Sequence, residues 1–332
     1  MDRITKDAAL QIAENIFGKN RWQCERLSGG GRNFCFKIAS DKHAYVLRIA
    51  DWGDLENLQS GFAWHTLLSG VTPVMPYLDH EFDKEKTPLP WLLMDFSDGD
   101  DIIKIYDQLI SEEKSSLSKE IFDIQNNAET TLDLYDNRQG TTDKAGFFRS
   151  VGDPWGDSWR DFIINSFRSK MKQLELGKID KDWDDLAQKA TALMEAFSNK
   201  GGFDIRPKRF LWDIGDRNVL VRNGKIVAII DVDGVGLGDR LMAPALAWVT
   251  IGQRWNDFNY ADAWSELECG DDEAKARLEG YKIFWILWFS TKYGKLSSNG
   301  SPQNLNYDRL KSMLLQTIKA MTIRTHGAAD HD

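Results

Sequence analysis

The stretch from residue 211 to 240, LWDIGDRNVLVRNGKIVAIIDVDGVGLGDR, contains the pattern that decides the fold of this 332-residue chain. Two apolar runs, at 219–222 and 225–231, are separated by Asn223-Gly224. An Asn-Gly pair between two such runs is the strongest short-range signal for a β-hairpin, because both residues tolerate the positive φ angles of a tight turn. The sequence therefore predicts a hairpin at this position.

Three polar side chains stand at the open end of the predicted hairpin. Asp213 lies on a loop five residues before Asn218, which opens the first strand, and Asp231 follows the apolar run of the second strand. A short antiparallel hairpin brings the entry of its first strand close to the exit of its second, so the three side chains should meet at one edge. Two carboxylates and a carboxamide supply hard oxygen ligands and one spare base, a set that suits Mg²⁺.

The spacing Asp-x-x-x-x-Asn, then a hairpin, then Ile-Asp followed by Gly-Asp, resembles the aminoglycoside phosphotransferase and choline-kinase-like branch of the protein-kinase fold. The resemblance implies that Asp213 accepts the proton of a substrate hydroxyl or orients that hydroxyl for attack. It also implies that Asn218 and Asp231 hold Mg²⁺ against the phosphates of ATP. Gly238-Asp239 matches the Gly-Asp of the family, in which the Asp usually braces the loop.

Two departures from the family pattern concern the support of this loop. The family has His-Gly directly before the catalytic Asp, where this chain has Leu211-Trp212, and the Pro that usually follows Gly-Asp is Arg240. Packing of Trp212 under the loop would be one substitute for the missing histidine. The sequence favours an ATP-dependent O-phosphotransferase that moves the γ-phosphoryl group to a hydroxyl of a small molecule, either an aminoglycoside-type antibiotic or a small metabolite. The alternative is a nucleotide-binding regulatory pseudokinase without transfer activity.

The segment before residue 97 is rich in short strand-like runs. Five runs of aromatic and β-branched residues alternate with turn signals, and two segments have helical periodicity. The predicted strands are 22–27, 33–38, 44–49, 74–78 and 91–96, and the predicted helices are 5–17 and 57–68. Such a set predicts a small lobe built on an antiparallel sheet.

Beyond residue 97 the strand signals thin out and apolar residues recur at helical intervals. The expected helical segments are 111–133, 159–174, 183–198 and much of 241–325, with the hairpin as the single strand cluster. Together with the resemblance, this pattern predicts an α+β, two-lobed protein-kinase-like fold. Its domains would be a nucleotide-binding lobe at 1–97 and a catalytic and substrate-binding lobe at 98–332.

Three parts of the first lobe resemble the nucleotide site of the family. A Gly-rich loop joins the first two predicted strands, where backbone N–H groups can approach phosphate oxygens. Arg48, on the third strand, matches the cation that contacts the phosphates, with Lys37 as the less favoured substitute. The segment 91–96 resembles the strand that leads into the hinge beside the adenine ring. The residues expected to bind the nucleotide are Ser28, Gly29, Gly30, Gly31, Asn33, Arg48, Met94, Asp95 and Phe96.

The partner of Arg48 is left open by the sequence. In the family a glutamate of the following helix pairs with this cation, but the residues at the expected positions, Gln59 and Ser60, are not acidic. Glu56, about one helical turn earlier, is the only glutamate of that helix. Glu56 is equally well explained as a solvated residue of the first helical turn, where the helix dipole favours a negative charge.

Charge and composition limit the classes of partner. The formal net charge of −9 repels phosphate backbones, which argues against nucleic acid. A cationic hydroxyl-bearing substrate is compatible with this charge, and acidic and aromatic residues that could bind one recur at 255–272. Three scattered cysteines, no signal-peptide pattern and no apolar run of about 20 residues favour a cytoplasmic protein without a membrane partner.

Overall fold

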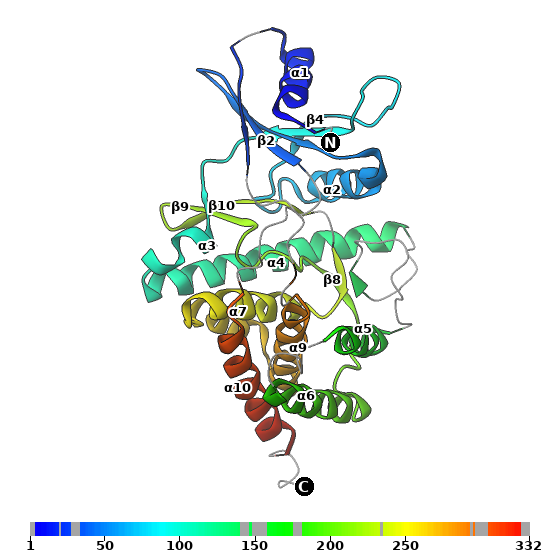
Figure 1. Ribbon diagram of the computed structural model, residues 1–332, viewed down its shortest axis with the longest axis vertical. Coiled ribbons are helices and arrows are strands. Elements are labelled where there is room, and N and C mark those ends of the chain that lie inside the picture. The colour runs from blue at the N-terminus through cyan, green and yellow to red at the C-terminus, as the bar shows by residue number, and fades with distance from the viewer. Residues whose placement is uncertain are drawn as a thin grey trace.

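The computed structural model describes residues 4–19, 21–27, 34–139, 146–147, 158–174, 181–232, 235–292, 295 and 305–326. Two lobes follow one another along the chain (Figure 1). The first contains a five-stranded sheet with helices α1 (Lys6–Phe17) and α2 (Leu55–Leu68), and the second is mainly helical. The predicted combination of a small sheet lobe and a larger helical lobe is confirmed.

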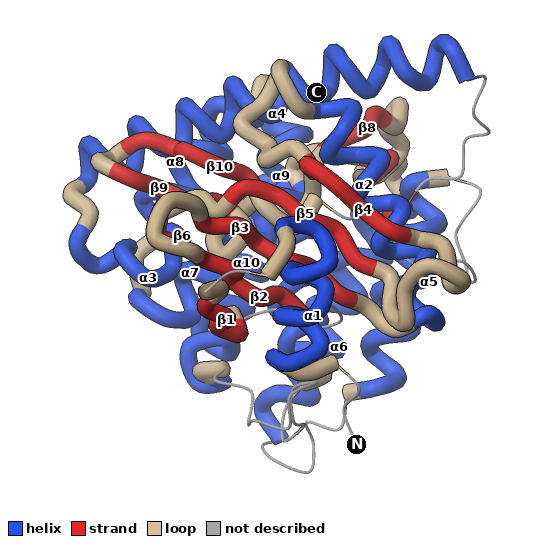
Figure 2. The backbone as a smooth tube through the Cα atoms, turned by 90° about the horizontal axis from the view of Figure 1, so that it is seen from above, coloured by secondary structure: helices blue, strands red, loops and turns tan. Residues whose placement is uncertain are grey.

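The sheet of the first lobe is antiparallel throughout. Its strands lie side by side in the order β1–β2–β3–β5–β4, as Figure 2 shows from above. Apolar side chains of one face, such as Phe36, Ile38 and Leu47, are fully buried in a cluster with Ile12 of α1, so burial of this face fixes the helix on the sheet. The strand bounds are β1 (Gln23–Arg26), β2 (Phe34–Ala39), β3 (Ala44–Ile49), β4 (Tyr77–Glu81) and β5 (Trp91–Asp95).

The fourth strand lies later in the chain than the predicted 74–78. β4 begins directly after Pro76, whose missing N–H cannot take part in a sheet ladder. Val74 is buried, but it pairs with Ile229 of the second lobe in a parallel bridge, and the Ile229 N–H donates to the Pro73 carbonyl at 2.8 Å. The apolar signal at Val74 therefore marks a contact between the lobes and not a position within the first sheet.

Helices make up most of the second lobe. The long helix α4 crosses the molecule beneath the first lobe (Figure 1) and packs against α8. Helix α9 packs against both α7 and α10. None of the described helices combines the length and the apolar composition that crossing a bilayer requires. The helix bounds are α3 (Ile102–Ile105), α4 (Ser111–Gln139), α5 (Trp159–Gln173), α6 (Lys181–Asn199), α7 (Met242–Trp255), α8 (Asn259–Glu268), α9 (Asp272–Ser290) and α10 (Tyr307–His326).

The predicted hairpin is confirmed as β9 (Val219–Arg222) and β10 (Lys225–Ile229). Asn223 and Gly224 have φ angles of 53° and 71°, so both turn residues are left-handed, as an Asn-Gly turn requires. The expectation of a single strand cluster was wrong, because strands of two or three residues are too short to show a period of two. The further strands are β6 (Asp100–Asp101), which pairs with β9, and β7 (Gly146–Phe147), β8 (Lys208–Phe210) and β11 (Gly236–Gly238), which form a sheet of their own.

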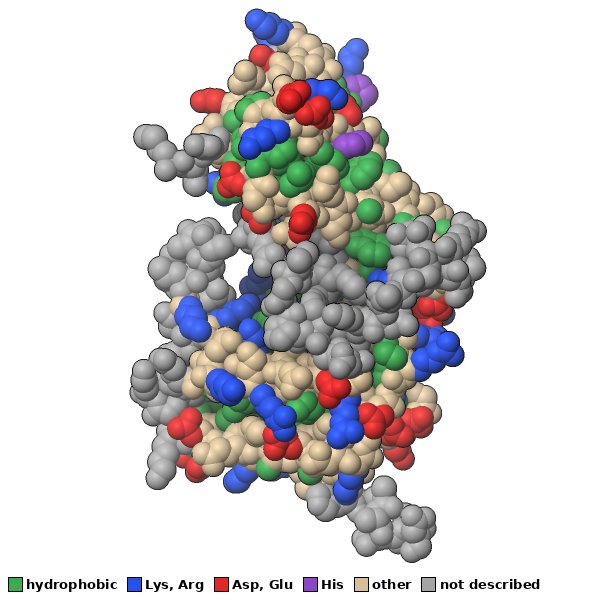
Figure 3. Space-filling model, turned by 90° about the vertical axis from the view of Figure 1, so that its right-hand side faces the viewer, with side chains coloured by type: hydrophobic (Ala, Val, Ile, Leu, Met, Phe, Trp, Pro, Cys, Tyr) green, Lys and Arg blue, Asp and Glu red, His purple; other side chains and the backbone are tan. Residues whose placement is uncertain are grey.

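The space-filling view of Figure 3 shows the first lobe above the second. β6 already pairs with the hairpin of the second lobe, so the chain has left the first sheet by residue 100. The domain boundary near residue 97 itself stays a prediction. The hairpin faces the first lobe, which places its open end between the two lobes.

Gly238 should be the least replaceable glycine of the sheet formed by β7, β8 and β11. A Cβ atom at Gly238 would lie 2.0 Å from ring atoms of Trp159. Trp159 is buried, and its indole N–H donates a hydrogen bond to the Tyr281 hydroxyl. Gly238→Ala should lower the free energy of unfolding by at least about 2 kcal/mol, measured from urea unfolding curves. Gly270→Ala is the control, because a Cβ there meets nothing within 4 Å. Equal unfolding midpoints for the two variants would show that Trp159 can move aside.

Candidate active site

Asp213, Asn218 and Asp231 meet at the open end of the hairpin. The Asn218 side-chain amide donates to the Asp213 carbonyl at 2.8 Å, and the Ile230 N–H donates to the Asn218 carbonyl at 2.8 Å. The first bond closes the loop that carries Asp213, and the second places Asp231 beside the start of β9. These bonds bring the main chain at the three positions together, and the joint action of their side chains stays a prediction.

Asp231 is held in an unusual conformation by the first lobe. Its φ angle is 59°, a left-handed value that costs free energy for a residue with a Cβ and is often found at functional sites. Its carboxylate lies 3.1 Å from the Arg48 guanidinium, which also donates to the Tyr77 hydroxyl at 3.0 Å. The Arg48 side chain is only 4% exposed and that of Asp231 is 43% exposed. The pair therefore has one buried end and one end open to solvent.

Helix α2 contributes a histidine to this region. Glu56 is exposed in the first turn of α2, whereas His65 is fully buried. The Val232 N–H donates to His65 Nε2 at 3.1 Å, so this nitrogen is the acceptor and His65 Nδ1 carries the proton that is donated to the Met75 carbonyl at 2.8 Å. His65 thus joins α2 to the residue that follows Asp231.

The expected nucleotide residues are only partly within the described chain. Ser28, Gly29, Gly30, Gly31 and Asn33 lie outside the described residues.

At the hinge, Met94 is buried, Asp95 is exposed, and the Lys37 ammonium lies 3.9 Å from the centre of the Phe96 ring. The Phe96 N–H already donates to the Ala44 carbonyl at 3.1 Å, so it is engaged in the sheet and does not face a ligand. Lys37 packs at the hinge instead of substituting for Arg48.

A glutamine of α4 supports the loop that lacks the family's His-Gly. The buried Gln125 side chain donates to the Leu211 carbonyl at 2.6 Å and accepts from the Leu211 N–H at 3.1 Å. The neighbouring Trp212 stacks on Trp285 of α9, with the ring planes 7° apart and the ring centres 6.2 Å apart. The expectation that Trp212 braces the loop is met by this stacking, and Gln125 adds a brace that the local sequence did not reveal.

Asp239 braces the segment that follows β11, as the resemblance implied. Its carboxylate accepts from the Leu241 N–H at 3.1 Å, from Arg277 at 3.1 Å and from the Tyr281 hydroxyl at 3.0 Å. Three donors therefore share one carboxylate. The contacts tie the segment to α9.

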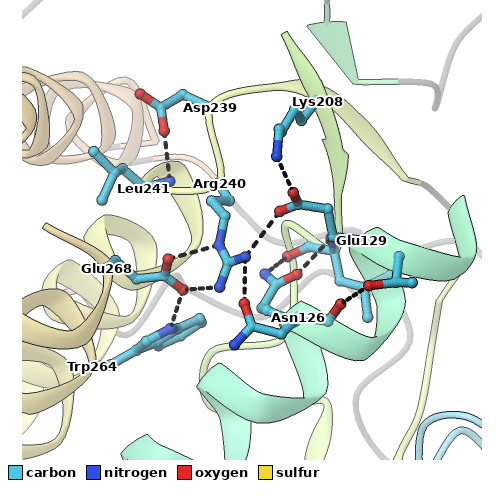
Figure 4. A network of polar contacts seen from close by, with 11 residues as sticks. Asn126, Glu129, Lys208, Asp239, Arg240, Leu241, Trp264 and Glu268 are labelled. Carbon is cyan, nitrogen blue, oxygen red and sulfur yellow. Dashed lines mark hydrogen bonds and ion pairs between the residues drawn. The ribbon is translucent and has the colours of Figure 1, made fainter. Parts of the chain in front are cut away.

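Arg240, which stands where the family usually has Pro, lies at the centre of a polar network (Figure 4). Its guanidinium contacts Asn126 at 2.8 Å and Glu129 at 2.9 Å on α4, and Glu268 at 2.7 and 2.8 Å on α8. Burial raises the pKa of Glu129, but hydrogen bonds from Lys208 and Arg240 outweigh it and hold that pKa below its ordinary value. Arg240 therefore adds a charged link, which a proline could not supply, between two helices that also pack against each other.

The carboxylates at 255–272 are largely used in structural contacts. Asp257 pairs with Lys114 at 2.7 Å, Glu268 pairs with Arg240, and Asp271 caps α9 by accepting from the Ala274 N–H at 2.7 Å. Trp264 is fully buried. The expectation that this segment forms a pocket for a cationic group is not supported by these contacts, because side chains engaged inside the protein are not available to a ligand.

The model of the phosphotransferase enzyme family matches residues 23–281. The chain belongs to this family. Among solved structures it is similar to aminoglycoside phosphotransferase APH(4)-Ia, with 18% identity, a TM-score of 0.64, and 95% of this chain and 99% of that chain covered. It is also similar to the GDP complex of aminoglycoside 2′-phosphotransferase-IIIa, with 12% identity, a TM-score of 0.68, and the same coverage of 95% and 99%. No curated protein matches the chain.

The family and the structural likeness confirm three sequence predictions. The chain has the two-lobed, protein-kinase-like fold, it is a member of the predicted family, and it is a phosphotransferase. Identities of 18% and 12% show the fold alone, so residue roles and the acceptor do not follow from the solved structures.

Sequence reasoning missed Gln125, His65 and Tyr77 in this phosphotransferase. Each acts on a residue far away in the chain: Gln125 on Leu211, His65 on Val232 and Tyr77 on Arg48. No local spacing links these pairs. For Gln125 and His65 the one available signal was a polar residue within a predicted helix, which sequence alone cannot distinguish from a solvated one, and Tyr77 of β4 gave no such signal.

Gln125→Leu should loosen the loop that carries Asp213. Two buried backbone groups of Leu211 would lose their partners, which should cost about 1–3 kcal/mol of stability. We expect kcat to fall about tenfold with little change in the KM for nucleotide, measured by steady-state kinetics. The exposed Asn127→Ala on the same helix is the control. An unchanged kcat in Gln125→Leu would mean that Trp212 is a sufficient brace.

His65→Phe should disturb the position of Asp231 without emptying the core. Phenylalanine fills the ring volume but can neither accept from the Val232 N–H nor donate to the Met75 carbonyl. We expect stability to fall by about 1–3 kcal/mol and the KM for nucleotide to rise severalfold. His43→Phe, at an exposed turn of the same lobe, controls for the substitution. A variant with lowered stability and unchanged KM would restrict His65 to a packing role.

Proposed function

We propose that the protein is an ATP-dependent O-phosphotransferase that moves the γ-phosphoryl group to a hydroxyl of a small molecule, an aminoglycoside-type antibiotic or a small metabolite. The observation that supports this most directly is the hydrogen-bonded convergence of Asp213, Asn218 and Asp231 at the base of one hairpin. Structures of similar fold contain AMP-PNP with hygromycin B, or GDP with kanamycin, which is consistent with a nucleotide and a hydroxyl-bearing acceptor.

Asn218 and Asp231 fit the requirements of Mg²⁺. A carbonyl only accepts hydrogen bonds, so the atom of Asn218 that faces the Asp213 carbonyl is the nitrogen, and the carboxamide oxygen is left for a cation. The Asp231 carboxylate is partly exposed and supplies a second hard oxygen. Mg²⁺ is typically held by one or two carboxylates together with water and phosphate oxygens, and when bound it neutralises phosphate charge.

Asp213 would accept the proton of the acceptor hydroxyl or orient that hydroxyl toward the phosphorus. Its loop is fixed at both ends, by Gln125 on Leu211 and by Asn218 on the Asp213 carbonyl. Phosphoryl transfer depends mainly on positioning and on charge stabilisation, so a rigid loop is the main requirement on this side. Arg48 would supply a positive charge to the nucleotide phosphates from the sheet, next to Asp231.

Asp213→Asn tests the proposal. The change removes the proton acceptor and keeps the size of the side chain, so transfer should fall by about 100-fold or more. Binding of MgATP, measured by calorimetry, should change less than about threefold, because Asp213 is not proposed to contact the metal. Asp231→Asn should instead weaken Mg²⁺-dependent nucleotide binding, because Asp231 is a proposed ligand of the metal.

Coupled ADP release with a panel of hydroxyl-bearing acceptors provides the measurement. Asp107→Asn, an exposed residue of the second lobe, is the matched control and should behave as the unmodified protein. Full transfer by Asp213→Asn would refute the assignment of the base. Nucleotide binding without transfer to any acceptor would instead favour the regulatory pseudokinase.

A further inference from the structure

Four basic side chains gather around the loop that carries Asp213. Arg217 is on the loop itself, Lys170 is on α5, Arg254 is near the end of α7, and Lys292 lies two residues after α9. In a chain with a formal net charge of −9, such a concentration of positive charge needs an explanation.

Stacked aromatic rings connect the loop to two of these cations. Trp212, next to Asp213, stacks on Trp285 of α9, whose ring centre lies 5.7 Å from that of Trp288 on the same helix. The Lys170 ammonium lies 3.9 Å from the centre of the Trp288 ring.

On the adjacent side of α9, the Phe289 ring centre lies 6.5 Å from that of Trp285 and 5.0 Å from the Lys292 ammonium. The two lysines are therefore positioned by rings that pack against the loop, and not by long side chains reaching in from elsewhere.

The cations act on one another. Burial, and then repulsion from Arg217 and Lys170, lower the pKa of Lys292, while Asp213 opposes this shift. Burial and repulsion from Arg217 likewise lower the pKa of Arg254, with Asp216 as the opposing carboxylate. Repulsion of this kind costs free energy in the absence of an anion, and binding an anion relieves it.

Three of the four cations have no carboxylate partner within the described part of the chain. For Arg217, Arg254 and Lys292, no carboxylate oxygen of the described residues lies within ion-pair distance. The acidic residues that face the cluster are Asp213 and Asp216, and both belong to the loop. Asp257 and Glu268 are not available to neutralise these cations, because they are paired with Lys114 and Arg240.

We propose that Arg217 and Lys292, supported by Lys170 and Arg254, bind an anionic group of the acceptor, a carboxylate or a phosphate, while the acceptor hydroxyl lies at Asp213. The inference rests on the proposed function and narrows its substrate class. A polycationic aminoglycoside would bring like charge to this cluster, which opposes binding. The cations all belong to the second lobe, whereas the candidate nucleotide residues Arg48 and Met94 are on the first sheet.

Acceptors with one skeleton and different charge test this proposal. Coupled ADP release with glucose, glucuronate, glucose 6-phosphate, glucosamine and kanamycin separates neutral, carboxylate, phosphate and cationic acceptors. We expect an anionic member to have a kcat/KM at least about tenfold above that of its neutral counterpart. The carboxylate and phosphate members decide between the two anionic groups.

Two single variants connect the preference to the cluster. Arg217→Gln and Lys292→Gln should each raise the KM for the anionic acceptor about tenfold and leave the KM for MgATP within about twofold. Lys319→Gln, an exposed lysine of α10, is the matched control and should leave both constants unchanged. Lys292→Glu should shift the preference toward glucosamine. Circular dichroism and thermal unfolding confirm that each variant is folded.

Two results would overturn the proposal. One is a preference for glucosamine or kanamycin in the unmodified protein, and the other is a rise in the KM for MgATP alone in Arg217→Gln and Lys292→Gln. If no acceptor is phosphorylated, calorimetric titration of the same compounds with MgADP present decides, and equal binding of anionic and neutral compounds counts against the cluster. The proposed function fails by separate results, namely no MgATP binding or full transfer by Asp213→Asn.

Discussion

The backbone hydrogen bond from the Ile230 N–H to the Asn218 carbonyl closes the base of the β9–β10 hairpin, and the candidate site depends on it. It holds the exit of β10 against the entry of β9, so Asp231 and Asn218 share an edge. The Asn218 side chain then fixes the Asp213 carbonyl on the preceding loop. A slip of one residue in this register would turn the alternate side chains of β10 to the opposite face and separate the three groups.

Contacts from both lobes keep this hairpin in place. On the side of the first lobe, the Pro73 carbonyl accepts from the Ile229 N–H, and His65 accepts from the N–H of Val232. On the other side, Gln125 satisfies both backbone groups of Leu211. Since an unsatisfied buried backbone group is costly, each of these contacts both positions the loop and removes a penalty.

Charged side chains of the second lobe fall into two groups, those paired inside the protein and those beside the Asp213 loop. Carboxylates of α8 and the turns around it pair with basic residues inside the second lobe, as in the network of Arg240 with Glu129 and Glu268. Arg217, Arg254 and Lys292, beside the Asp213 loop, lack such partners among the described residues, although the whole chain is acidic. The proposed anionic acceptor differs from the cationic one that is compatible with the net charge, because net charge averages over the whole surface and says nothing of one site.

The sequence by itself determined the two-lobed fold, the hairpin and its turn, most helices, and the convergence of Asp213, Asn218 and Asp231. These features follow from local periodicity, turn chemistry and short spacing, which a linear pattern contains. The tertiary structure alone decided that Arg48 pairs with Asp231, that β4 begins after Pro76, and that short strands such as β8 and β11 pair. It also brought Gln125, His65 and the basic residues to the loop. These depend on which helices and strands pack together, and that is fixed by burial across the whole core and not by spacing along the chain.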